Sequence, residues 1–186
     1  MSHVGTSAAS SGHRGERGMI EPISGADEAT IAAQLGRTPR GLAGVAWRCS
    51  CGKPAVVATL PALPDGTPFP TSYYLTCPRA AAACSTLEAG GVMRDMADRL
   101  AEDQQLAEAY AAAHDAYIAD RRTLGGDLTV AAIDGISAGG MPDRVKCLHA
   151  LAGHALAAGP GVNPLGDETV RLLGSFWDRP CLGEQT

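Results

Sequence analysis

The segment 141-MPDRVKCLHALAGHALAAGPGVNPLG-166 carries most of the information about the fold and the site. Alanine, leucine and glycine dominate it, and Pro142 and Gly159 are suitable residues for the start and the end of a helix. The spacing predicts a helix from Pro142 to about Ala158 with no clearly polar side, which is typical of a buried helix. We therefore expect this helix to pass through the middle of the domain.

Four reactive side chains interrupt this apolar helix: Lys146, Cys147, His149 and His154. Burying charged or polar groups without partners is costly, so each of them needs one. We expect the helix to line a polar pocket. We also expect Lys146 to be partly buried and paired with a carboxylate, with Glu88 or Asp95 as the preferred partner.

Upstream of this helix, the sequence predicts a small antiparallel sheet within residues 43–77. Along residues 43–51, one set of side chains (Val45, Trp47, Cys49 and Cys51) alternates with another, which is the spacing of a strand. Gly52-Lys53-Pro54 is a turn signal, and a second run of residues that favour strands follows it. The segment 71-TSYYLTC-77 predicts a third strand that ends at Pro78. A short helix is expected before the sheet, over residues 24–37, with Ser24 or Asp27 as its cap.

The remaining segments predict helices. Residues 85–122 have apolar side chains at three- and four-residue spacing, interrupted near Gly90, and residues 167–177 form a last helix. Ser85 and Glu88 have the spacing of a capping box, which competes with a site role for Glu88. The predicted fold class is α+β, a small antiparallel sheet packed on a bundle of about four helices. Residues 1–18 are expected to be a disordered tail and residues 19–186 a single domain.

Composition excludes some classes of function. The net charge is −5 and no block of Lys or Arg occurs, which argues against nucleic-acid binding. We find no apolar run long enough to span a bilayer and no signal peptide, so we expect no membrane association and a cytoplasmic location. Disulfides are uncommon there, so the six cysteines need another explanation.

Our first hypothesis is a metal site with cysteines from three segments. Cys49, Cys77 and Cys147 would converge, with Cys51 or His149 as a fourth ligand, and would hold zinc or an iron–sulfur cluster. The Cys49–Cys51 pair has one intervening residue, fewer than usual in zinc sites. The alternative is that these cysteines are small buried hydrophobes. Cys84 and Cys181 have no companion motif and are expected to be structural or exposed.

The second hypothesis is an enzyme with Cys147 as nucleophile, in a pocket lined by Lys146 and histidines. His149 and His154 are candidates for the base, and Glu88 would orient the base or a substrate. In a regular helix Cys147 and His149 face apart, which favours His154 or His114. A protein–protein adaptor without a site is a third interpretation.

Several blocks together resemble the DUF501 family of bacterial proteins: RCSCGKPAVV, DGTPFPTSYYLTCP, the Leu87-Glu88 pair, VKCLHALAGHALA and NPLG. The resemblance runs from about Gly36 to the last helix and suggests an actinobacterial member. Because the family's function is unknown, the resemblance implies little chemistry. It does imply that Cys49, Cys77 and Cys147 follow the family pattern, with His149 or His154 completing the set. A protein partner in cell division or polyphosphate metabolism is implied only by gene neighbourhood, whereas a regulatory or scaffolding role is what the metal-site hypothesis suggests.

Overall fold

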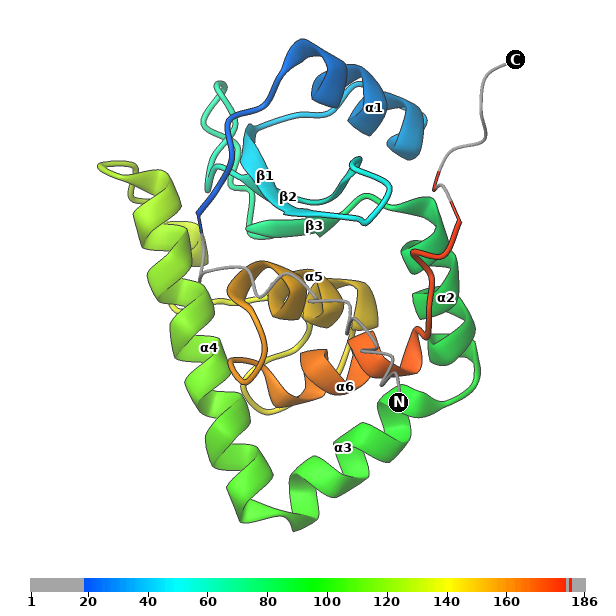
Figure 1. Cartoon of the computed structure of the whole chain (residues 1–186). Helices are drawn as coiled ribbons and strands as arrows, with labels where there is room; N and C mark the ends of the chain where they lie inside the picture. Colours follow the sequence, from blue (N-terminus) through cyan, green and yellow to red (C-terminus); the bar gives the residue numbers. More distant parts are fainter. Residues whose placement is uncertain (1–18, 180, 182–186) are drawn as a thin grey trace, which may run out of the picture.

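The computed structural model describes residues 19–179 and residue 181, and it confirms the predicted α+β fold (Figure 1). The elements in chain order are α1 Gly25–Leu35, β1 Leu42–Arg48, β2 Pro54–Thr59, β3 Tyr73–Leu75, α2 Pro78–Ala89, α3 Val92–Glu102, α4 Gln104–Gly125, a 3₁₀ turn at Ala131–Ile133, α5 Leu148–Ala158 and α6 Pro164–Leu172. The predicted tail, residues 1–18, lies outside the described residues. None of the described helices is both long and apolar enough to cross a membrane.

The sheet is antiparallel in the order β1-β2-β3, and the predicted hairpin at Gly52-Lys53 is confirmed. Every residue of the central strand β2 is buried. Figure 1 shows why, because α1 lies over one face of the sheet and α5 lies under the other. A strand covered on both faces is expected to be rich in small and β-branched apolar residues, and PAVVAT fits this pattern.

Helix α5 lies at the centre of the fold, as predicted, and packs on the sheet, on α6 and on α2. Two glycines permit these close approaches. A Cβ on Gly153 would lie 3.2 Å from the carbonyl oxygen of Tyr73, and a Cβ on Gly166 would lie 2.5 Å from that of Leu151. The predicted start of the helix at Pro142 is wrong, because α5 begins at Leu148.

The long helix predicted to end near Arg122 is divided. Gly91 precedes α3 as expected, but a second break falls at Asp103, whose side chain accepts a hydrogen bond from the Leu106 backbone N–H at 3.1 Å. The apolar stripe nevertheless continues from α3 onto α4, and its buried members include Met96, Leu100, Tyr110 and Tyr117. The periodicity therefore gave the correct buried face, whereas the N-terminal cap of α4 was missed.

The hydrogen bonds of two arginines connect segments of the fold that are distant in the sequence. Buried Arg121 donates to the backbone carbonyls of Pro70, Ile133 and Ile136, so that it connects the loop after α4 to the chain before β3. Its charge is compensated by carbonyl dipoles, and it also donates to the Ser72 hydroxyl.

The second arginine, Arg48, joins β1 to α1. Its guanidinium donates to both carboxylate oxygens of Asp27, at 2.7 and 3.1 Å. Ser24, one of the two caps predicted from the sequence, caps α1 and forms a capping box with the same aspartate. The hydrogen bonds from Arg48, with smaller contributions from Ser24, hold the pKa of Asp27 well below its usual range despite the opposing effect of burial.

Candidate metal site

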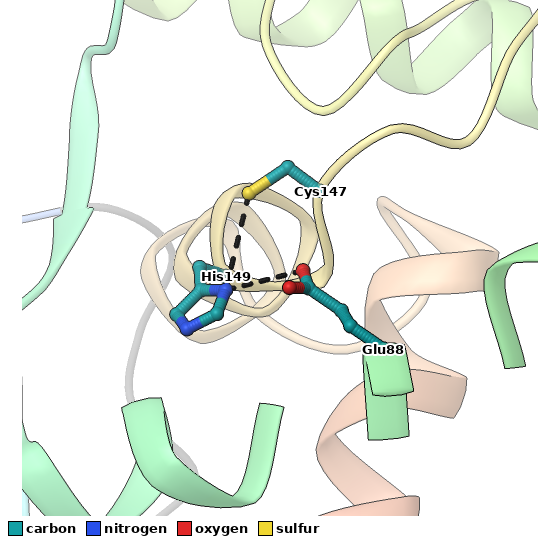
Figure 2. A group of neighbouring side chains, drawn as sticks. All are labelled: Glu88, Cys147 and His149. Carbon is teal, nitrogen blue, oxygen red and sulfur yellow. Dashed lines mark hydrogen bonds and ion pairs between the residues drawn. The ribbon is translucent and has the colours of Figure 1, made fainter. Parts of the chain in front are cut away.

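Glu88, Cys147 and His149 form the one group of possible metal ligands that stands out in the described part of the chain (Figure 2). One ligand atom from each lies within 4.8 Å of the other two. Glu88 comes from the last turn of α2, whereas Cys147 and His149 come from the start of α5. Two segments about sixty residues apart in the sequence therefore meet at this point.

The start of α5 places the cysteine beside the histidine. Cys147 is the N-cap residue and has an extended backbone, with φ −158° and ψ 108°, while His149 is the second helical residue. The Cys147 Sγ atom lies 4.0 Å from the His149 Nδ1 atom. Our expectation that these side chains face apart was wrong, because it assumed a regular helix through both residues.

Glu88 links α2 to the first turn of α5. Its Oε1 atom accepts a hydrogen bond from the Leu148 backbone N–H at 2.7 Å and lies 3.1 Å from His149 Nδ1. A carboxylate in this position is stabilised by the positive end of the helix dipole. The predicted capping box with Ser85 is wrong, because α2 begins at Pro78 and Ser85 lies inside it. Glu88 therefore caps a helix other than its own.

The contact of the second ring nitrogen of His149 with the backbone of α2 fixes the orientation of the ring. Its Nε2 atom lies 3.1 Å from the Ala81 carbonyl oxygen and 3.4 Å from the Ser85 hydroxyl oxygen, and because a carbonyl only accepts, a hydrogen bond to Ala81 places the hydrogen on Nε2. Nδ1 then faces the Glu88 carboxylate and the Cys147 sulfur. The repulsion between these atoms is relieved either by a proton, carried by Nδ1 or by the Cys147 thiol, or by a metal ion. A hydrogen bond from the non-ligating nitrogen to a backbone carbonyl is the usual arrangement for metal-bound histidine.

The geometry is close to that of a zinc site. Ligand atoms at about 2.0 to 2.3 Å from a tetrahedral zinc are separated by about 3.4 to 3.8 Å. The observed separations of 3.1 Å from Glu88 to His149 and 4.0 Å from His149 to Cys147 bracket this range. The side chains of Glu88 and His149 are 24% and 31% exposed, so that an ion and one solvent ligand can reach them.

Cys84 lies close to this group but has a different character. It is fully buried on α2. Burial is the main cause that raises the pKa of its thiol to about 12, and the nearby Glu88 and Cys147 add to the shift. Cys84 therefore stays protonated at neutral pH and packs as a small apolar residue, in agreement with the structural role expected for it.

Two other sequence candidates have different surroundings from those predicted. Lys146 is exposed, and within the described residues it has no ion pair, so the expected buried pair with Glu88 or Asp95 is wrong. The reason is that residues 142–147 are not helical. His154 is fully buried, packs against the rings of Tyr73 and Tyr117, and is close to Asn163, with 3.2 Å between Nδ1 and the amide nitrogen.

The other predicted ligands lie outside this group. Cys49 and Cys51 lie in the connection between β1 and β2. Cys77 is the N-cap of α2, eleven residues before Glu88, which corresponds to about 16 Å along a helix. The structure thus brings together Cys147 and His149 but adds Glu88 in place of the other cysteines. From the sequence, Glu88 was expected only as a residue of the enzyme hypothesis or as an ion-pair partner of Lys146, because its contact with the start of α5 has no local signal.

The fold and this group define a small α+β protein with an oxygen, a sulfur and a nitrogen atom that could hold a metal ion. The family model described as "Protein of unknown function (DUF501)" matches residues 45–171, and the chain belongs to this family. The matched region contains all three residues of the candidate site. No curated protein and no solved structure matches the chain.

Proposed function

We propose that this protein binds a single zinc ion through Glu88, Cys147 and His149. The observation that carries the proposal is the direction of the His149 ring. Its Nε2–H is committed to the Ala81 carbonyl, while Nδ1 faces both the thiol and the carboxylate. One carboxylate, one thiolate and one imidazole suit zinc, whereas an iron–sulfur cluster requires several thiolates.

Three protein ligands leave a fourth coordination position for water or a small ligand. Closed four-ligand sites are usually structural, and open sites are typical of zinc that exchanges ligands or acts on a substrate. Because the group is partly exposed at the start of α5, a small ligand can reach an ion held there. We infer that the ion binds an exchangeable ligand at its fourth coordination position. Regulation of the protein by the supply of metal is the alternative role for the same site.

The test combines a measurement of zinc affinity with NMR spectra of the ring nitrogens of His149. We expect wild-type protein to bind zinc, and long-range ¹H–¹⁵N spectra to show metal on Nδ1 and hydrogen on Nε2. Glu88→Gln preserves an acceptor for Leu148 but removes the charge, and should weaken binding at this site by more than about tenfold. Cys147→Ala should abolish binding at this site.

Lys146→Gln is the matched control, because Lys146 adjoins Cys147 in sequence but is exposed and contributes no ligand. It should bind zinc as the wild type does. If His149 Nδ1 shows a proton that zinc does not displace, the cation in this group is a proton and the proposal is wrong.

A second candidate is the cysteine nucleophile, favoured by the 4.0 Å contact between Cys147 and His149. The arrangement fits it less well. In a Cys-His-carboxylate relay the acid holds the nitrogen remote from the thiol, whereas here Glu88 and Cys147 address the same nitrogen. If Cys147 is alkylated rapidly in zinc-free protein and the rate does not change when zinc is added, the result supports the cysteine nucleophile over the metal site.

A further inference from the structure

Two cysteines that are far apart in the sequence meet beside the turn between β1 and β2. Cys51 lies on this turn, and Cys181 reaches it from the C-terminal end of the described chain, 130 residues later. Both are free thiols, and their Sγ atoms are 3.8 Å apart, which is van der Waals contact for two sulfur atoms. Bonded sulfurs lie at about 2.05 Å, so these two need to approach each other by less than about 2 Å to form a disulfide.

The backbone of the turn fixes the position of Cys51. The Gly52 backbone N–H donates to the Cys49 carbonyl at 2.8 Å, and the Cys49 N–H donates to the Lys53 carbonyl at 3.0 Å. Gly52 has φ +79°, a conformation that favours glycine. The chain therefore reverses directly after Cys51, and the side chain of this cysteine lies at the end of the hairpin.

Other contacts hold the C-terminal segment, which we define as residues 173–179 and Cys181, over this turn. The rings of Trp47 and Phe176 lie 6.2 Å apart, and the Ser50 hydroxyl donates to the Trp177 carbonyl at 3.2 Å. These contacts come from residues on both sides of Cys49 and do not involve a sulfur atom. The C-terminal segment is therefore placed beside the hairpin independently of its cysteine.

Gln34, on α1, orients the Cys181 side chain. Its amide nitrogen donates to the Pro54 carbonyl at 2.7 Å and lies 3.4 Å from Cys181 Sγ. An amide N–H only donates, so the sulfur accepts in this contact. The pair of sulfurs is thus built by α1, by the hairpin and by the C-terminal segment together.

The two thiols differ in exposure and in acidity. Cys51 is partly exposed, whereas Cys181 is only 8% exposed. Burial raises the pKa of the Cys51 thiol, but hydrogen bonds from the backbone N–H groups of Lys53 and Cys181 outweigh it, so the net direction is downward. For Cys181 burial predominates over the hydrogen bond from Gln34 and raises the pKa. Because the thiolate is the form that reacts with oxidants, a small oxidant that reaches this place reacts first with Cys51.

We propose that Cys51 and Cys181 form a reversible disulfide when the protein encounters a peroxide. The Cys51 thiolate attacks one oxygen of hydrogen peroxide, the O–O bond breaks, and the products are Cys51 sulfenic acid and hydroxide, which takes up a proton to become water. The Cys181 sulfur then attacks the Cys51 sulfur, the S–O bond breaks, and the hydroxyl leaves as water with the proton of Cys181. The two thiols are oxidised, the peroxide is reduced to two molecules of water, and a dithiol reductant reverses the change.

The disulfide would join the C-terminal segment covalently to the hairpin. Cys51 lies inside the region that the family model matches, residues 45–171, and Cys181 lies beyond it. A bond between residues this far apart in the sequence restricts the unfolded chain strongly, so the oxidised protein should resist unfolding better than the reduced protein. The site shares no residue with the proposed zinc site.

The experiment treats reduced wild-type protein with hydrogen peroxide, blocks the remaining thiols by alkylation and maps the peptides by mass spectrometry. We expect one disulfide within the chain, between Cys51 and Cys181, with a mass lower by two hydrogen atoms. The midpoint of urea unfolding should shift upward, and dithiothreitol should restore both thiols and the original midpoint. Zinc or a chelator should change neither the pairing nor the yield, so this outcome is independent of the zinc proposal.

Three variants test the order of the steps. Cys181→Ser should stop at the sulfenic acid, which dimedone traps on Cys51, and Cys51→Ser should give no adduct at Cys181. Cys49→Ser is the matched control, because it keeps a hydroxyl beside Cys51 and should form the same disulfide. A disulfide between Cys49 and Cys51, a disulfide between two chains, or Cys51 that stays a free thiol after peroxide has oxidised other cysteines of the wild type would overturn the proposal.

Discussion

Acidification should destabilise this protein through one buried histidine, His154. The ring is fully buried against Tyr73 and Tyr117, and its Nδ1 atom accepts from the Asn163 amide. Burial lowers the pKa of His154 to about 4. The folded chain therefore keeps the ring neutral over a range of pH in which the unfolded chain protonates it.

The direction and the size of the change in stability follow from the difference in the pKa of His154 between the folded and the unfolded chain. Below the ordinary value of 6.5 the unfolded state binds a proton that the folded state does not, so stability falls as the pH falls from 6.5 towards 4. Between about pH 7.5 and about pH 5 the expected loss in the free energy of unfolding is about 2 kcal/mol, and it approaches about 3 kcal/mol at lower pH.

Urea unfolding followed by tryptophan fluorescence, in the presence of a chelator, measures this loss. His154→Gln should remove most of the dependence on pH across this range, whatever its own stability at neutral pH. His114→Gln is the matched control, because His114 is only partly buried and is hydrogen-bonded to Ser137, and it should retain the dependence. Equal slopes in wild type and His154→Gln would refute the reasoning.

Other predictions concern packing and charge. Gly166→Ala should destabilise the chain by about 1–3 kcal/mol in chemical denaturation, because the added Cβ meets backbone, whereas Gly25→Ala, with open space around it, should have little effect. Arg121→Leu should cost about 3 kcal/mol or more by leaving buried carbonyls unpaired, and exposed Arg122→Leu less than about 1 kcal/mol. Asp27→Asn should remove stability that is present above about pH 4 and is lost as the pH falls further, and acid titration of both proteins measures the difference.

Features with local signals were predicted well from the sequence. The hairpin follows from the turn at Gly52-Lys53, and the burial of α5 follows from a helix without a polar side. The boundaries of α5 were less accurate. Lys146 N–H donates to the Gly139 carbonyl at 2.7 Å, a contact that closes a loop and delays the helix to Leu148. That delay is also why Cys147 meets His149.

The candidate site was predicted only in part, because its contacts are long-range. Cys147 and His149 were recognised from their residue types within one segment. Glu88 reaches them from α2, and Cys181 reaches Cys51 from the far end of the chain, so neither contact has a signal in sequence spacing. The prediction that Cys49, Cys77 and Cys147 share one ion stays a prediction.

The most direct test of the zinc site is a crystal structure of zinc-loaded protein, with anomalous diffraction measured on both sides of the zinc absorption edge. We predict an anomalous peak at bonding distance, about 2.0 to 2.3 Å, from Glu88 oxygen, His149 Nδ1 and Cys147 Sγ. The Nε2–H of His149 should still donate to the Ala81 carbonyl. Full zinc occupancy elsewhere, with no peak among these three side chains, would contradict the account.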